Sequence, residues 1–242
     1  RLFFEKALNE AAERLAHAPF AVIAGDLDRF KAVNDIHGHA AGDEVIRTVA
    51  ERLREAVGES GLVSRVGGDE FVLLINAFRD RSRLSLLAQS IIASVSMPIT
   101  LSTGAVVDVG ISLGIATAPE SGASAGDIME IADRALYASI LASGDALVHG
   151  CEAETFCMVG AEARACGLPV VVPDRGGAAD HGKDGAGLAY EAGNIASARD
   201  AILEILGQER DHVARPVRTM EDHFRNLFDS YASIAATRSR AA

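Results

Sequence analysis

The sequence lacks the cysteine pattern of a secreted or zinc-binding protein. Its 242 residues include only three cysteines, Cys151, Cys157 and Cys166. None of them has Cys-x-x-Cys spacing, and no histidine stands at a zinc-like distance from them. We therefore expect three reduced thiols in a cytoplasmic protein, with neither a disulfide framework nor a structural zinc site.

Positive charge is also scarce. There are 23 Lys and Arg residues against 34 Asp and Glu residues, which gives a net charge of −11 at pH 7. Since binding to a nucleic-acid backbone depends on Lys and Arg, this balance argues against nucleic acid as a partner. The stretch 84–107 carries no charge, but Gln89, Pro98, Gly104 and seven Ser or Thr residues argue against a membrane span. An amphipathic pattern opens the chain in place of a signal peptide.

The most informative pattern is a short turn between two apolar runs. Residues 65–71 read Arg-Val-Gly-Gly-Asp-Glu-Phe. Two adjacent glycines allow the backbone to turn sharply and to approach a ligand closely. The pattern predicts a β-hairpin whose turn presents two carboxylates, Asp69 and Glu70, to solvent.

A second acidic motif lies upstream, where the apolar run 20–25 leads into Asp26. If this strand and the hairpin belong to one sheet, Asp26 and Asp69 lie at neighbouring strand ends. Two carboxylates and a main-chain carbonyl suit Mg²⁺, which prefers hard oxygen ligands and leaves positions open for phosphate. The sequence therefore predicts a magnesium site at this edge.

Three polar residues after that strand suit a nucleotide. Lys31 would supply a positive charge opposite a phosphate, while Asn34 and Asp43 offer an amide and a carboxylate that can read a guanine edge. An apolar helical period follows, so we expect a helix that begins just after Asp43 and buries Val45, Ile46, Val49 and Leu53.

These motifs, in this order and spacing, resemble the GGDEF family of diguanylate cyclases over about residues 1–139. The segments 107–116 and 132–137 carry the resemblance further. Members of this family join two GTP molecules into cyclic di-GMP and release pyrophosphate. The resemblance implies GTP as substrate, Mg²⁺ (or Mn²⁺) as cofactor and a homodimer as the active form. It also implies an α/β fold in which helices flank a nucleotidyl-cyclase-like sheet.

The resemblance implies roles for individual residues. Asp26, the Leu27 carbonyl and Asp69 would hold the metal. Asp69, with Glu70, would help to deprotonate the attacking 3′-hydroxyl. The residues in contact with the nucleotide would be Lys31, Asn34, His39, Asp43, Gly67 and Gly68.

The sequence departs from the family pattern near residue 140. Ile140 and Gly144 stand where the family has a Lys and an Arg that touch the GTP phosphates. The closing strand of the family is not recognisable, and the segment 145–149 is expected to take its place. We therefore expect a GGDEF domain incomplete at both ends. The alternative to a cyclase is a catalytically impaired module that binds GTP or cyclic di-GMP.

Residues 140–242 are expected to form a second domain. Their pattern reads strand, loop, helix, strand and Gly-rich loop, with the continuous apolar strand 170–172 typical of a parallel sheet. The helix is expected to begin near Thr155 or Phe156 and to stop at Gly167. A third strand is expected at 187–190, with helices at 196–207 and 217–235.

This second part resembles the end of the donor lobe of retaining GT-B glycosyltransferases of the family-4 type. The carriers are Glu154 and Glu162, the run 165–172 and the Gly176-Gly177 loop. The resemblance implies a sugar-nucleotide site with Glu162 on the ribose and the diphosphate at the helix start, where Cys157 replaces the usual glycine. About 100 residues cannot supply both walls of such a cleft, so we expect a short Rossmann-like βαβ fragment, a remnant that packs without catalysing.

Overall fold

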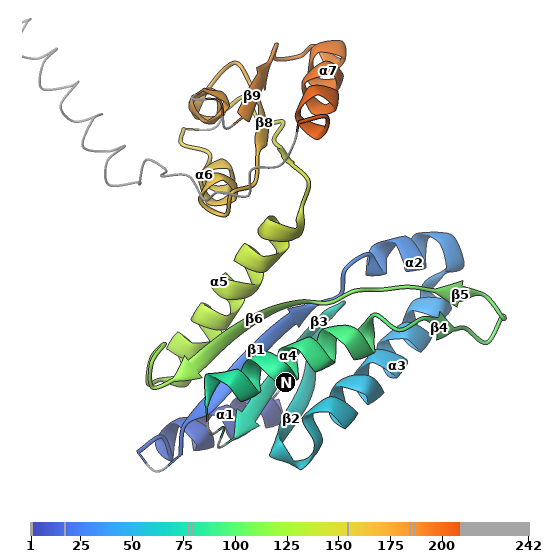
Figure 1. Ribbon diagram of the computed structural model, residues 1–242, viewed down its shortest axis with the longest axis vertical. Helices are drawn as coiled ribbons and strands as arrows, with labels where there is room; N and C mark the ends of the chain where they lie inside the picture. Colours follow the sequence, from blue (N-terminus) through green and yellow to red (C-terminus); the bar gives the residue numbers. More distant parts are fainter. Residues whose placement is uncertain are drawn as a thin grey trace, which may run out of the picture. The chain divides into compact units, whose positions relative to one another are not determined.

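The computed structural model describes residues 2–208, except residues 17, 77, 79, 154, 184 and 186 (Figure 1). The chain divides into two compact units, Arg1–Ser139 and Ile140–Ala242. No helix of the described part is long and apolar enough to cross a membrane.

The first unit is built on a four-stranded antiparallel sheet with the strand order β2-β3-β1-β6. Strand β1 lies at its centre, because it pairs with β3 on one side and with β6 on the other. The strands are β1 (Phe20–Asp26), β2 (Gly61–Gly67), β3 (Glu70–Asn76) and β6 (Ser112–Ala118).

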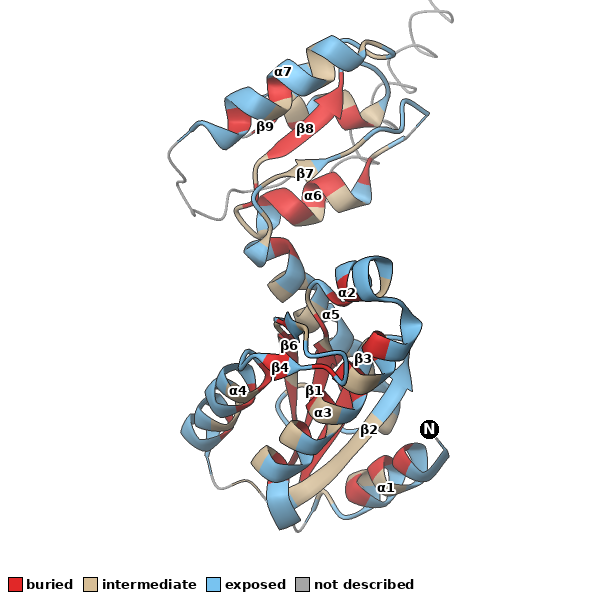
Figure 2. Cartoon of the chain, turned by 90° about the vertical axis from the view of Figure 1, so that its right-hand side faces the viewer, coloured by how far each residue is buried: buried red, intermediate tan, exposed pale blue. Residues whose placement is uncertain are grey.

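Helices cover both faces of this sheet, and each face has its own apolar core (Figure 2). Helices α1 (Leu2–Glu13) and α5 (Ala125–Ser143) pack on one face, where Phe4, Leu8 and Ile128 are buried. The opposite face is covered by α2 (Phe30–His37), α3 (His39–Val57) and α4 (Arg81–Val95). The predicted α/β architecture is confirmed.

Helix α3 begins earlier than the sequence predicts. Its first residue is His39, and Gly38 before it adopts a φ of 81°, which ends α2 and starts α3. Asp43 therefore lies in the second turn of α3, and the prediction of a start after Asp43 is wrong. His39 and Ala40 in the first turn are exposed, so the periodic pattern of apolar residues does not extend to the start of the helix.

Helix α3 is fastened to the far end of α4. The guanidinium of Arg52 donates to the main-chain oxygens of Val95 (3.0 Å), Met97 (2.6 Å) and Pro98 (3.0 Å). Hydrogen bonds from a charged donor are stronger than neutral ones, so Arg52 fixes the chain where it leaves α4. A hairpin follows, formed by β4 (Ile99–Thr100) and β5 (Val106–Val107).

The second unit contains a three-stranded parallel sheet in the order β7-β8-β9. Its elements are β7 (Leu147–Val148), α6 (Met158–Ala165), β8 (Val170–Pro173), the 3-10 turn η2 (Gly177–Gly182), β9 (Gly187–Tyr190) and α7 (Ile195–Leu206). A further 3-10 turn, η1 (Gly58–Ser60), belongs to the first unit. Val170, Val171 and Val172 are fully buried, as the apolar run predicts. The Rossmann-like fragment is confirmed.

Two details of this unit differ from the prediction. Strand β7 pairs with β8 through Leu147 and Val148, so the expectation that segment 145–149 closes the first sheet is wrong. Helix α6 starts at Met158, after a left-handed residue at Cys157, and not at Thr155 or Phe156. The helix expected at 217–235 lies outside the described residues.

Candidate active site

The acidic residues of the two motifs meet at one end of the central strand. Asp26, the last residue of β1, lies opposite Glu70 of β3 on one side and opposite Ser112 of β6 on the other. The next residue, Leu27, donates its main-chain N–H to the carbonyl oxygen of Asp69 at 3.2 Å. The antiparallel register therefore brings together carboxylates that are more than 40 residues apart in the sequence.

Partial burial, together with neighbouring negative charge, raises the pKa of Asp26 to about 6. Partial burial is the largest cause, and the charges of Asp69, Glu70 and Asp28 add to it. A raised pKa means that the ionised carboxylate is unfavourable in this place. A cation bound nearby would stabilise the ionised form.

The carboxylates of Asp26 and Asp69 and the carbonyl of Leu27, the metal ligands expected from the sequence, are hard oxygen atoms of the kind that could hold Mg²⁺ or Mn²⁺. Among the residues that the structure describes, no cluster of three or more His, Cys, Asp or Glu side chains forms a ready metal cage. Two carboxylates with a carbonyl leave coordination positions for water and phosphate.

The glycine turn is fixed by Arg65, a residue for which the sequence predicts no role. Arg65 donates from Nε (2.9 Å) and Nη2 (2.7 Å) to the carbonyl oxygen of Gly68. Gly68 adopts a φ of 39°, a left-handed conformation that favours glycine. A Cβ atom at Gly67 or Gly68 would meet no atom within 4 Å, so the main chain of the turn is accessible to a ligand. The position of Arg65, two residues before Gly67, is the sequence feature that could have predicted this contact.

Asp28 is a second residue for which the sequence predicts no role. Its Oδ1 accepts a hydrogen bond from the Ser112 hydroxyl at 2.8 Å, and its main chain exchanges two hydrogen bonds with Gly110. These contacts continue the β1–β6 pairing beyond Asp26. Arg29 then adopts a left-handed φ of 64°, which turns the chain into α2. The sequence displays the Asp-x-Asp spacing of Asp26 and Asp28. It does not display the hydrogen-bond partner of Asp28, because Ser112 is 84 residues away.

The expected guanine-reading pair is arranged by a close crossing of α2 and α3. The side-chain oxygen of Asn34 occupies the space that a Cβ atom at Gly42 would fill, and the Phe30 ring lies beside it. Gly42 thus allows Asn34 to lie against α3 one residue before Asp43. Asn34 is half-buried and Asp43 is exposed.

The remaining predicted residues stand at the surface. Lys31 on α2 and His39 at the start of α3 are exposed, and neither side chain makes a hydrogen bond within the described ranges. They lie on α2 and α3, the two helices that carry Asn34 and Asp43.

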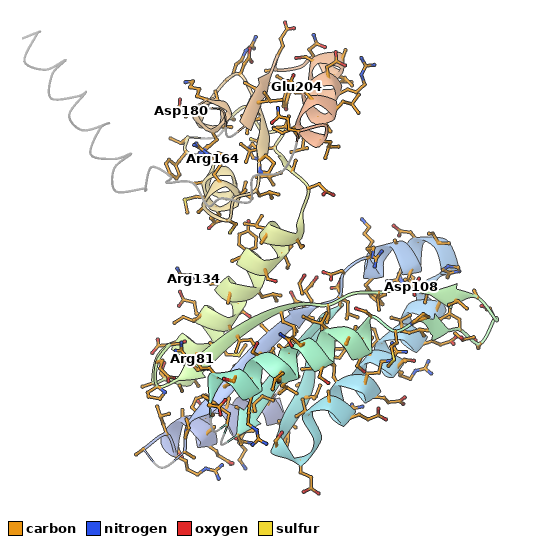
Figure 3. The ribbon with its side chains drawn as sticks, viewed as in Figure 1. Arg81, Asp108, Arg134, Arg164, Asp180 and Glu204 are labelled. Carbon is orange, nitrogen blue, oxygen red and sulfur yellow. The ribbon has the colours of Figure 1, made fainter. Side chains whose placement is uncertain are left out.

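Helix α5 approaches the carboxylate cluster at one point. Burial and the charge of Glu70 raise the pKa of Asp133. Further along, Ile140 is 37% exposed and Gly144 follows the end of the helix, so neither position offers a cation. Arg134, on the same helix, extends from it into solvent (Figure 3).

In the second unit the helix start differs from an open anion site. Cys157, the residue before α6, has a left-handed φ of 58° and a buried side chain, which explains why a glycine suits this position. The buried ring of His181 lies close by, with Nε2 donating to the Phe156 carbonyl at 2.9 Å. Glu162 is half-buried on α6, while Glu154 lies outside the described residues.

Known proteins resemble this chain mainly in its first part. Diguanylate cyclase TpbB of Pseudomonas aeruginosa is 41% identical over 141 residues, which cover 57% of this chain and 32% of that protein. The bifunctional diguanylate cyclase/cyclic di-GMP phosphodiesterase MucR of the same species is 39% identical over 139 residues, 57% of this chain and 20% of that protein. The chain thus spans a third or less of these relatives.

Solved structures agree with the sequence comparison. The GGDEF domain of TpbB from Pseudomonas aeruginosa superposes with a TM-score of 0.55 at 41% identity and covers 57% of this chain and 86% of that one. The GGDEF domain of DgcB from Caulobacter crescentus, solved in complex with c-di-GMP, has a TM-score of 0.54 at 29% identity and covers 58% and 84%.

The raised pKa of Asp26 predicts a pH-dependent effect of Asp26→Asn on the metal-free protein. Above pH 6 the ionised carboxylate of Asp26 lowers the free energy of unfolding, because its pKa in the folded protein exceeds its pKa in the unfolded chain. After allowance for solvent screening, the substitution is expected to stabilise the protein at pH 8 by about 1 kcal/mol. The gain shrinks as the pH is lowered toward 4.

Urea unfolding in EDTA between pH 4 and pH 8 measures this effect, with Glu59→Gln as a control that removes an exposed charge from η1. A gain from Asp26→Asn that is independent of pH would contradict the assignment.

Two family profiles match the chain, in agreement with the resemblances of its two parts. The profile described as Glycosyl transferases group 1 matches residues 132–220, which supports a glycosyltransferase-like fragment in the second unit. The profile described as Diguanylate cyclase, GGDEF domain, matches residues 1–144. With more than half of its length matched and its carboxylate turn in place, the chain belongs to the GGDEF family of diguanylate cyclases.

Proposed function

We propose that residues 1–139 form a nucleotidyl-transfer domain that condenses two GTP molecules into cyclic di-GMP with Mg²⁺ or Mn²⁺. The single observation that carries this proposal is the register of β1 and β3, which places Asp26 opposite Glu70 and bonds Leu27 to Asp69. Synthesis of cyclic di-GMP is the function of the family to which the chain belongs.

In this proposal each 3′-hydroxyl oxygen attacks the α-phosphorus of the other GTP, and the bond to the β-phosphate breaks to release pyrophosphate. Asp69, with Glu70 beside it, accepts the proton that the hydroxyl loses. Asp26, Asp69 and the Leu27 carbonyl would hold the metal, which would neutralise the triphosphate and polarise the α-phosphate. The main chain of Gly67 and Gly68 lies close to the phosphates.

The base is bound on the helical side of the site. Asn34 and Asp43 hydrogen-bond the guanine edge, and Lys31 and His39 contact the rest of the nucleotide. Since each domain holds one GTP, turnover needs two copies facing each other, and we propose a homodimer in the cytoplasm. Nucleic acid is not a partner in this proposal, in keeping with the net charge of −11.

Turnover is tested by incubating the full chain with GTP and Mg²⁺ and following cyclic di-GMP and pyrophosphate. The Asp69→Asn variant is expected to lose about 10³-fold in rate, because it removes a metal ligand and a proton acceptor together. Glu59→Gln, at an exposed position away from the turn, serves as the matched control. Equal rates for Asp69→Asn and the control would contradict the assigned role.

A second candidate function rests on Ile140 and Gly144, which offer no cation to the phosphates. The unit would then bind GTP or cyclic di-GMP without turning it over. Guanine recognition survives this loss, because Asn34 and Asp43 lie on other helices. Saturable GTP binding without product would favour this reading.

Gly42 provides a sharp test of guanine recognition under either reading. In Gly42→Ala the new methyl group occupies the place of the Asn34 amide, so GTP affinity is expected to fall about tenfold, as in Asn34→Ala. Gly126→Ala is the matched control, since that glycine is exposed in the first turn of α5. Calorimetric titration measures the affinities. An unchanged GTP affinity of Gly42→Ala would contradict the proposal that Asn34 binds the guanine.

For residues 140–242 we propose a glycosyltransferase remnant that does not hold a sugar nucleotide tightly. The support is Cys157, whose buried side chain stands where a phosphate would approach the start of α6. We expect no saturable binding of UDP-glucose or GDP-mannose at millimolar concentration. Binding that is lost in Glu162→Gln would contradict this proposal and would favour an active sugar-nucleotide site with Glu162 and Glu154.

A further inference from the structure

The two edge strands of the first sheet differ in how they are protected. Strand β2 carries Arg65, and its pairing with β3 is interrupted by a bulge between Arg65 and Gly67. Charged residues and bulges are devices that keep an edge from pairing with another strand. Strand β6 has neither, since its seven residues, Ser-Leu-Gly-Ile-Ala-Thr-Ala, are uncharged and pair with β1 without interruption.

Alternate residues of β6 direct their main-chain groups to the free edge. Gly110 exchanges both its hydrogen bonds with Asp28, so residues at even positions face β1 and those at odd positions face outward. At Thr117 the outward groups are satisfied by Ser121, at 3.2 Å and 2.7 Å. Within the described part of the chain, the outward N–H and C=O groups of Leu113 and Ile115 have no partner.

An apolar groove of about 430 Å³ runs beside this edge, on the face covered by α4. Its walls include Leu84, Ala88 and Ile92 of α4 and Ile115 of β6. Arg81 is the one charged residue in its lining among the described residues. Figure 3 places Arg81 at the end of the unit where α4 begins.

The position of Arg81 along the strand follows from the register. Helix α4 begins five residues after Asn76, which pairs with Phe20, and Phe20 pairs on its other side with Ala118. Arg81 therefore lies toward the Ala118 end of β6. A strand added antiparallel to β6 would begin at this end.

A second copy of β6 does not fit this edge. Main-chain atoms of Ala132 and Leu136 fill the space above Gly114, so α5 lies directly over β6. A second copy that paired its Ile115 with Leu113 would place the two strands about 4.8 Å apart, with their α5 helices on the same face. Helices pack at about 8–10 Å, so these two would collide.

We propose that the outer edge of β6 and the adjoining groove bind an extended segment of another protein as a fifth strand. The segment pairs with the main chain of Leu113 and Ile115, places alternate apolar side chains in the groove and sets an acidic residue near Arg81. Main-chain hydrogen bonds supply affinity, and the groove selects the side chains, as in other cases of strand addition.

A designed peptide tests this proposal on the full chain. The probe begins with glutamate, alternates valine with threonine and ends in tryptophan, with both ends blocked. Because the protein contains no Trp, tryptophan emission reports the peptide alone. We expect saturable binding, together with slower hydrogen exchange at the amides of Leu113 and Ile115. Arg81→Glu is expected to weaken binding about fivefold, whereas Arg83→Glu, which does not line the groove, leaves it unchanged.

Three outcomes would overturn the proposal. The first is the absence of saturation at millimolar peptide. The second is equal binding of a peptide N-methylated on its pairing edge, which cannot donate to β6. The third is a dimer of the free chain, seen by light scattering, that protects the same two amides, since this would assign the edge to a second copy. The arginine variants keep the strand intact, so misfolding does not obscure the result.

Discussion

The central position of β1 is the constraint on which the first unit depends. Its pairing with β3 and β6 places Asp26 between Glu70 and Ser112, and the same register fixes Leu27 against Asp69. A slip by one residue would turn Asp26 to the other face of the sheet and separate it from the turn. The buried residues of β1 on both faces make that slip costly, because each face packs against its own helices.

Local patterns sufficed to predict the hairpin turn, the strand that ends at Asp26 and the apolar strand at 170–172. Each depends on the order of neighbouring residues, which a sequence displays directly. The contact of Asn34 with Gly42 depends instead on how closely two helices cross. That distance is set by packing across the whole unit, so the sequence could predict a role for Asn34 without showing its contact with Gly42.

The second unit shows the same division between local and distant information. The continuous apolar run predicts the buried valines of β8. The strand that pairs with β7 could not be predicted in this way, because Leu147 pairs with Val170, which is distant in the sequence. At Cys157 a left-handed conformation and full burial act in opposition, since glycine would relax the backbone but leave the core unfilled. Such a compromise is visible only when backbone and packing are seen together.

The double hydrogen bond from Arg65 to Gly68 has a thermodynamic consequence for any ligand of the turn. A glycine pair left to itself would sample many conformations, and a ligand would lose affinity in choosing one of them. In this protein the turn is ordered when the chain folds, so its loss of conformational entropy does not reduce the affinity for a ligand. The turn is preorganised by the residue that introduces it.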